Sequence, residues 1–424
     1  MRRYLAFVSL FVIPSLCFSQ TPPSALGSAA PALPATALTL PQVLDLAHRS
    51  NPTLLSAAQH FAAVHAQEIT AGLRQNPNLT AAGQMITLGP DDPNGPDFYS
   101  VGAQRLFERG NKRQLRVDTA RSMTALTGFQ LDDQRRQTDL AIRQAFSRML
   151  YARQALAISR DNLEGYGKTV TLMKVRLDAG ELDQTDFDRI ELQLVGFESD
   201  SDNAALTLRQ ASIALQNLIG IGRPREDFNI TGTLDPPPVG ITLDVLRAEA
   251  LAGRPDLKAA QTQVNVDIAS AKLAVANGTA DPIVESDYER TGHANTVGAN
   301  INIPLRIFDR NQGEKERTRY EVESSRLALI AAQNQVLSDV DSAWAGYQTA
   351  RVQSDRYQSK YLAEAAHVRD NLEFSYRNGN STLLDYLSAL SDYRLVNLAA
   401  LNAKLQVLLS IEQLSYAAHT EINP

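Results

Sequence analysis

Residues 295–313 link an amphipathic strand to a very long helix, and no other stretch restricts the fold as much. Apolar residues alternate with polar residues or glycine: Val297, Ala299, Ile301, Ile303 and Leu305 against Thr296, Gly298, Asn300 and Asn302. This alternation predicts a strand over 295–305 with one apolar and one polar face. Pro304 and the segment 309–313 end the pairing, and a charged stretch with helical periodicity follows over 313–377. The chain must therefore place this strand directly before a long helix.

The same pattern occurs twice. Residues 39–54 match residues 242–257 at one constant offset, since 242 − 39 and 255 − 52 are both 203. This predicts two structural repeats, 39–241 and 242–424, each with short helices, two strands, a long helix and a return helix. The expected strands are 77–88 and 98–107 in the first repeat and 281–291 and 295–305 in the second, with the hairpin turn of the second at 292–294. The expected helices are 111–178 and 183–219, then 313–377 and 382–419.

The strands raise a closure problem. Four strands cannot form a closed barrel, and an open sheet with an apolar face would leave unpaired backbone groups in lipid. Other copies of the chain must supply the missing strands. Two copies would give a narrow barrel filled by side chains, and three would give twelve strands around a wider lumen.

The two long helices have apolar residues in steps of three, four and seven. Such spacing is typical of helices that pack along their length, and about sixty-five residues would extend about 100 Å. The spaced residues are Ile142, Phe146, Met149, Leu156, Leu163, Val170, Met173 and Leu177 in the first copy, and Leu337, Val340, Trp344, Tyr347, Tyr361, Val368, Leu372 and Tyr376 in the second.

Each long helix ends in a matching turn. Gly180 and Gly379 suit the left-handed residue that closes a helix. Asp183 and Thr382 then suit the N-cap of the return helix. The aspartates Asp186 and Asp385 follow in its first turn, where they favour the helix dipole.

The N-terminus predicts export. Basic residues, an apolar run and small residues near a cleavage point make residues 1–19 a signal peptide. The alternative, a lipoprotein signal at Cys17, is disfavoured because the bulky Leu16 precedes the cysteine. Residues 20–38 form a Pro/Ala-rich tail that we expect to be disordered. Cys17 is the only cysteine of the chain, so the mature protein would hold no disulfide.

Composition and motifs exclude several classes of function. The net charge is −6 with both signs mixed, so no basic face for nucleic acid is evident. The six histidines show no metal-protease spacing, and no phosphate-binding loop or nucleophile elbow occurs. We therefore expect no enzyme, no metal site and no cofactor. No segment after the signal reaches the roughly 20 uncharged apolar residues of a spanning helix, so strands would have to cross any membrane.

The junction Ile-Pro-Leu-Arg-Ile-Phe-Asp-Arg-Asn-Gln-Gly at 303–313 resembles that of the TolC-like outer-membrane efflux proteins, especially their CzcC-like cation-efflux branch. The resemblance implies a mainly helical homotrimer whose transmembrane β-barrel, four strands per chain, continues into a long periplasmic α-helical barrel. It also implies a passive exit duct in the outer membrane, working with a periplasmic adaptor protein and an inner-membrane pump of the RND or ABC type.

The resemblance further implies a gate at the two turns. Thr185, Asp186, Tyr376 and Asp385 occupy the positions that hold the periplasmic entrance shut in this family. Ser381 and Ser388 depart from the pattern, because a family member has an arginine and an acidic residue there. Helix capping is the other interpretation of the two aspartates.

Two questions stay open from the sequence. The cargo could be a metal cation, a drug or a protein, and the junction favours divalent metal cations. The alternative function is an exported coiled-coil scaffold or adhesin without a pore, which would need neither apolar strand faces nor a duplication.

Overall fold

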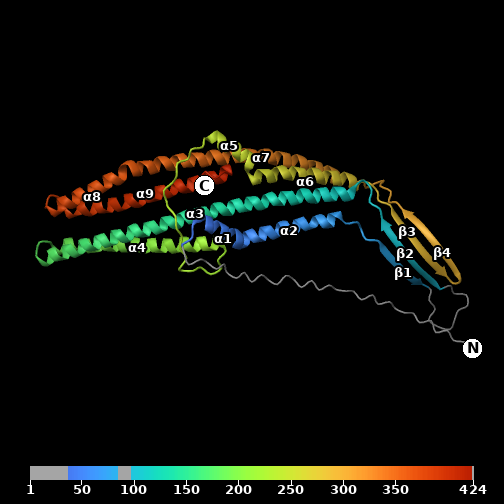
Figure 1. Ribbon diagram of the computed structural model, residues 1–424, viewed down its shortest axis with the longest axis horizontal. Helices are drawn as coiled ribbons and strands as arrows, with labels where there is room; N and C mark the ends of the chain where they lie inside the picture. Colours follow the sequence, from blue (N-terminus) through green and yellow to red (C-terminus); the bar gives the residue numbers. More distant parts are fainter. Residues whose placement is uncertain (1–36, 85–96, 423–424) are drawn as a thin grey trace, which may run out of the picture.

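The computed structural model describes residues 37–84 and 97–422, and the molecule is a long rod with a sheet at one end and two helical turns at the other (Figure 1). The signal peptide at 1–19, including Cys17, and residues 20–36 of the tail lie outside the described residues. The first repeat comprises α1 (Leu40–Ser50), α2 (Pro52–Gly72), β1 (Asn78–Gln84), β2 (Phe98–Leu106), α3 (Lys112–Asp178) and α4 (Gln184–Ile219).

The second repeat has the same order of elements. It comprises α5 (Leu243–Gly253), α6 (Pro255–Asn277), β3 (Ile283–Thr291), β4 (Ala294–Asn302), α7 (Gln312–Arg356), a π-helix η1 (Tyr357–Tyr361), α8 (Leu362–Arg377) and α9 (Leu383–Ala418). The 67 residues of α3 extend about 100 Å. Toward the sheet α2, α3, α6 and α7 lie side by side, and toward the turns α3, α4, α8 and α9 do so.

Several expected features differ in detail. The third strand begins at Ile283 and not at 281, because Pro282 has no N–H for the pairing. The fourth strand ends at Asn302, so Ile303 and Leu305 lie beyond the sheet; Pro304 has no N–H to continue the pairing. Ala294 is the first residue of β4, which leaves a hairpin turn of only Gly292 and His293. The second long helix is interrupted by η1. The end of the first strand, 85–88, lies outside the described residues.

The sheet is antiparallel throughout, in the order β1-β2-β3-β4. Its central pairing, β2 with β3, joins the two repeats. One face carries a row in which Val101 pairs with Tyr288 and Tyr288 with Val297, and these side chains are exposed. The other face is polar and less exposed. Within the described residues, β1 and β4 have an unpaired outer edge each.

Both long helices begin in the same unusual way. Asn111 and Asn311, in the positions before α3 and α7, have left-handed backbones with φ of 58° and 61°. Asparagine tolerates this conformation better than most residues. The Asn311 side chain donates a hydrogen bond of 2.8 Å to the Ala274 carbonyl, which fixes the strand-to-helix turn against α6.

The helix breaks at the middle of the molecule are anchored differently in the two repeats. Asn51 caps α2 by accepting from the N–H groups of Thr53 and Leu54, and it donates to the Leu218 carbonyl at 2.7 Å. The matching Arg254 is 3% exposed, and its guanidinium pairs with Asp256 and Asp339. Because a buried cation needs such partners, this position ties α6 to α7.

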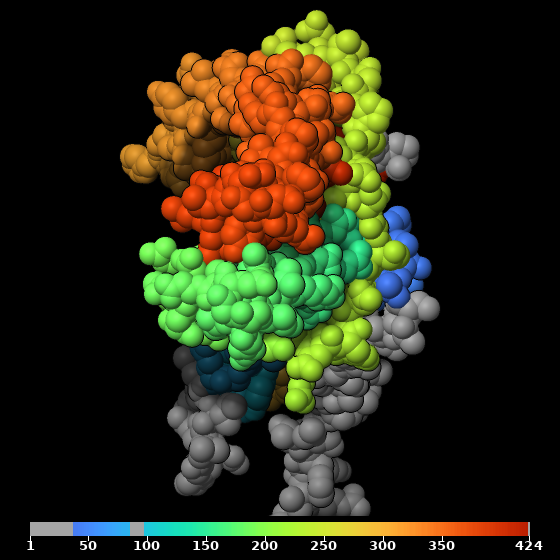
Figure 2. Space-filling view, turned by 90° about the vertical axis from the view of Figure 1, so that its left-hand side faces the viewer, coloured from blue at the N-terminus to red at the C-terminus, as the bar shows by residue number. Residues whose placement is uncertain are grey.

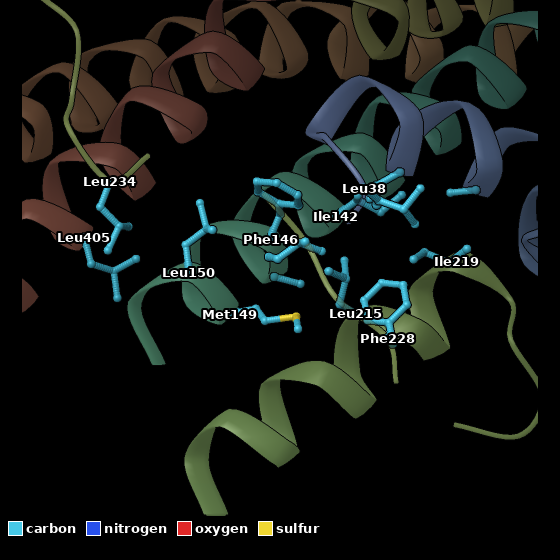
Figure 3. Packing of buried hydrophobic residues seen from close by; sticks show 14 of the residues in the cluster. Leu38, Ile142, Phe146, Met149, Leu150, Leu215, Ile219, Phe228, Leu234 and Leu405 are labelled. Carbon is cyan, nitrogen blue, oxygen red and sulfur yellow. The ribbon is translucent and has the colours of Figure 1, made fainter. Parts of the chain in front are cut away.

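The main core lies around the middle of the rod. Leu38 and side chains of α1, α3, α4 and α9 pack there with the connector between α4 and α5 (Figure 3). Phe228, Ile230 and Leu234 of this connector are buried, and Leu38 pairs with Ile230 in a short parallel bridge. The connector crosses the long helices and runs along one side of the body (Figures 1 and 2).

A glycine closes the first repeat at this core. Gly220 ends α4 with φ of +90°, and a Cβ at this position would lie 2.3 Å from the Ser50 carbonyl oxygen. Only glycine fits both the backbone and the space.

Within the described residues, α9 has the length and composition of a membrane-spanning helix, against the expectation that no segment does. Its apolar side chains have another use. Val407, Ile411 and Leu414 are buried in a second core with Val336 and Val340 of α7. The helix is therefore a core element of the helical body.

Candidate functional site

The two turns at the end of the rod have one shared geometry. Gly180 and Gly379 both have φ of +74°. In the first turn, the Glu181 N–H donates to the Arg176 carbonyl at 2.8 Å, and in the second the Asn380 N–H donates to the Ser375 carbonyl at 2.8 Å. These bonds satisfy carbonyls that the helix end leaves free, and the left-handed glycine makes the reversal without strain. The two hairpins end next to each other (Figure 2).

The structure places both expected N-caps and gives Asp385 a capping role. The side chain of Asp183 accepts a hydrogen bond from the Thr185 N–H at 3.3 Å. Thr382 and Asp385 form a capping box: the Thr382 hydroxyl donates to Asp385 Oδ2 at 2.6 Å and accepts from the Asp385 N–H. These hydrogen bonds hold the pKa of Asp385 below its usual range.

Two further gate candidates, Thr185 and Asp186, lie at the start of the first return helix. Thr185 is exposed, and its side chain makes no described hydrogen bond. Asp186 lies 3.7 Å from Arg189 in an ion pair one helical turn away. Asp186 also acts on Tyr376: burial is the main cause that raises the pKa of the tyrosine, Arg176 lowers it, and the charge of Asp186 raises it. Asp186 and Tyr376 therefore share one electrostatic environment.

Tyr376 packs between the two hairpins. Its ring stacks on Tyr386 with centroids 5.6 Å apart, and its hydroxyl lies 3.6 Å from the sulfur of Met173 in α3. Thioether sulfur is a weak acceptor, so most of the contact is packing. The tyrosine thus links α8 to α9 and to the opposite hairpin.

The buried core next to the two turns contains several residues that were not anticipated from the sequence. Tyr166 is buried, donates to the Ile190 carbonyl at 2.8 Å and stacks on Phe197 at 4.4 Å. Arg394 of α9 lies over the Phe197 ring at 4.9 Å and pairs with Asp200 at 3.0 Å. The sequence offered one signal: Tyr386 matches Phe187 at the offset of the two turns, since 386 − 187 = 199. In the structure, both aromatic side chains are buried at the start of a return helix.

No metal site is found in the part of the chain that the structure describes. Across 37–84 and 97–422, no group of three or more histidine, aspartate or glutamate side chains is arranged to hold a metal ion.

The second repeat carries the family signature. Residues 246–418 match the family model described as outer membrane efflux protein. Over these residues the resemblance of the chain to the TolC-like outer-membrane efflux proteins is confirmed. The expected outer-membrane location agrees with this match, and the matched family is one of channels rather than enzymes.

Related proteins agree with this membership. The chain is 23% identical over 354 residues to the cobalt-zinc-cadmium resistance protein CzcC of Cupriavidus metallidurans, covering 83% of each chain. It is 22% identical over 281 residues to the outer membrane efflux protein BepC of Brucella suis, covering 63% of this chain and 59% of BepC.

The fold of the chain is also found among solved structures. A membrane protein from Pseudomonas aeruginosa superposes with a TM-score of 0.78 at 17% identity, over 89% of this chain and 92% of that one. The mostly helical rod with a small antiparallel sheet is thus a known architecture.

Proposed function

We propose that the protein is the exit duct of a tripartite efflux system, in which three copies form a twelve-stranded barrel in the outer membrane and a helical tunnel in the periplasm. The observation that carries this proposal is the sheet, which has an exposed apolar face, a polar face and two free edges. The duct conducts passively, and an inner-membrane pump supplies the energy through a periplasmic adaptor.

The apolar face suits contact with lipid. Its side chains are exposed by 77% at Leu79, 51% at Val101, 81% at Val297 and 68% at Ile301. In water such a face is unfavourable, by about 25 cal/mol per Å² of apolar surface. In a bilayer it is favourable, provided that every backbone group at the sheet edges finds a partner. Pairing of β1 with β4 of a neighbouring copy satisfies both edges.

The polar face suits a water-filled lumen. Three acidic residues of β3, Glu285, Asp287 and Glu289, share this face, because they alternate with the exposed residues. Asp287 lies over Gly298, where a Cβ would come within 2.7 Å of its carboxylate, and beside Gly102. Glycine on both sides lets the acidic side chain lie flat against the sheet, which leaves the lumen open.

The acidic face also bears on the cargo. A ring of carboxylates favours cations in a pore, and CzcC is by name a cobalt, zinc and cadmium resistance protein. We therefore assign the duct to heavy-metal cation efflux driven by an RND-type pump, with drug efflux as the second choice.

The turns at the far end of the rod form the proposed gate. Thr185, Asp186, Tyr376 and Asp385 lie at or next to these turns, which Gly180 and Gly379 shape. Apolar side chains there remain exposed, including 69% of Phe374 and 73% of Leu384. Such exposed apolar surface is suited to contacts with the other copies and with the adaptor.

The test is single-channel recording of the purified protein in a planar lipid bilayer, with crosslinking to count subunits. Discrete openings from a trimer are the expected result. A protein that stays soluble without detergent, is monomeric or dimeric and passes no current would reject the duct. That outcome would favour the exported scaffold or adhesin without a pore.

A further inference from the structure

A cavity of about 420 Å³ lies where the first repeat passes from sheet to helix. Its walls come from three segments: the link between α2 and β1, the end of β2, and the start of α3. Four cationic side chains line it, Arg74, Arg105, Lys112 and Arg113, together with one carboxylate, Glu108. The cavity is therefore basic.

Two of the charges are already neutralised. Lys112 is buried, pairs with Asp281 at 2.5 Å and donates to the Thr279 carbonyl at 2.7 Å. Glu108 pairs with Arg116, whose guanidinium also donates to the Leu73 carbonyl at 3.3 Å. These contacts join α3 to the end of α2 and to the link between α6 and β3, so they build the wall of the cavity rather than fill it.

Three guanidinium groups remain. Among the residues that the structure describes, Arg74, Arg105 and Arg113 have no carboxylate within salt-bridge distance. Arg105 lies over the Phe107 ring at 5.2 Å, which orients it without neutralising it. Three guanidinium groups that line one cavity suit phosphate oxygens as ligands, because each guanidinium can donate two parallel hydrogen bonds.

One lining residue of the cavity, Arg105, lies on the apolar face of the sheet. Arg105 pairs with Val284, and Val284 with Ile301, so the arginine shares the face of the apolar residues. Along the same strand, Ala103 and Val101 follow at steps of about 7 Å toward the hairpin end. A ligand with its phosphate at Arg105 therefore has an apolar surface directly beside it.

The second repeat lacks this arrangement at the matching level. At the offset of Asn111 and Asn311, the positions of Arg105, Glu108 and Arg113 hold Leu305, Phe308 and Gly313. Leu305 is 78% exposed and Phe308 is 90% exposed. The residues that line the basic cavity of the first junction are therefore not repeated at these positions of the second junction.

We propose that this cavity binds the headgroup of an anionic glycerophospholipid, with the phosphodiester at Arg74, Arg105 and Arg113 and the acyl chains along the apolar face of β2 and β3. The inference rests on the proposed barrel, because only a membrane-embedded sheet presents its apolar face to acyl chains. An anionic headgroup is favoured over a zwitterionic one, whose ammonium group would meet the arginines.

The experiment uses the full protein in nanodiscs of equal parts phosphatidylglycerol and phosphatidylcholine, transferred to detergent and weighed by native mass spectrometry. We expect about one retained phosphatidylglycerol per chain in the wild type. The double variant Arg74→Gln/Arg113→Gln should retain at least tenfold less. Both positions lie outside the strands, so the sheet itself is unchanged.

The matched control is Arg306→Gln, at the junction of the second repeat, where the arginine pairs with Asp309 at 3.8 Å. It should retain lipid like the wild type. Equal retention by the double variant, or equal retention of both lipids, would overturn the site. Displacement of the lipid by millimolar inorganic phosphate would assign the cavity to a free anion and overturn the lipid.

Single-channel recording of the same wild-type sample separates this inference from the proposed function. A wild type that conducts but retains no phosphatidylglycerol overturns the lipid site alone. A wild type that retains it but never conducts overturns the duct and supports the site.

Discussion

Glu412 of α9 is the least satisfied carboxyl group in the described part of the helical body. One carboxylate oxygen accepts from the Ser147 hydroxyl at 2.6 Å, and the other, Oε2, is buried without a hydrogen-bond partner. Burial is the largest effect and raises its pKa to about 7, although Ser147, Arg143 and Arg148 lower it. The residue therefore opposes folding when it is ionised.

This predicts a pH-dependent gain from Glu412→Gln. A raised pKa in the folded state means that the contribution of Glu412 is fully favourable below about pH 4.5 and is lost as pH rises through about 7. At pH 8 the variant should therefore unfold at a higher temperature than the wild type, and its free energy of unfolding should be larger by on the order of 2 kcal/mol. At pH 4.5 the two should coincide.

The measurement is thermal unfolding of the detergent-solubilised protein between pH 4.5 and 8. Glu198→Gln, at an exposed carboxylate of α4, is the control and should leave the profile unchanged. A gain from Glu412→Gln that is the same at every pH would contradict this account.

Tyr376 allows a test of the proposed gate with the loss of one oxygen atom. Tyr376→Phe keeps the ring that stacks on Tyr386 and removes the hydroxyl that reaches Met173 in the opposite hairpin. We expect a severalfold rise in passive uptake of a hydrophilic dye through the outer membrane. Tyr320→Phe, at an exposed tyrosine of α7, should not change uptake. Equal uptake in both variants would remove Tyr376 from the gate.

At the scale of the element, the two long helices differ although they occupy matching places. The first is continuous over 67 residues, while η1 interrupts the second at Tyr357–Tyr361. A π-turn holds one residue more than an α-turn. The helix segments before and after it keep the directions in which their side chains point.

Removal of one residue from η1 should therefore be tolerated. Deletion of Ser359 would convert the π-turn to α-helix and keep Ala350 and Tyr376 on their present faces. Deletion of Gly167 from the continuous helix would instead rotate every following residue by about 100° and break the contacts of Met173. We expect the first variant to melt within a few degrees of the wild type and the second to lose its near-ultraviolet circular dichroism. Similar losses in both would show that η1 is not a one-residue insertion.

Some of these elements could be predicted from the sequence, and others could not. Alternation located the residues of β2 and β4, and glycine chemistry located both turns, because these signals are local. The π-helix carries no local signal, since it depends on how the neighbouring helices pack. The same is true of Tyr166 and Glu412: spacing indicates that they lie on a helix, but only the tertiary contacts decide which partner each meets.

At the scale of the whole molecule, the proposed barrel depends on the difference between the two faces of one sheet. Val297 and Thr296 are neighbours in β4 but point to opposite faces. An arginine at 297 would face lipid, at a cost of about 2–4 kcal/mol per chain near the middle of the bilayer. An arginine at 296 would face the lumen.

We therefore expect Val297→Arg to abolish the urea-resistant, membrane-inserted trimer and Thr296→Arg to preserve it. Membrane flotation and semi-native electrophoresis measure both. Insertion of both variants, or of neither, would contradict the assignment of the faces.

The order of the strands also determines when each strand can find its partner during folding. Pairing of Phe98–Leu106 with Ile283–Thr291 joins segments that are separated by all of α3, α4, α5 and α6. A chain exported from its N-terminus presents the first hairpin well before the second exists. Until then β2 has a free edge and an apolar face in water, the combination most prone to wrong pairing. If the protein works as the proposed outer-membrane duct, the first repeat is therefore exposed to wrong pairing for as long as the second repeat has not followed it.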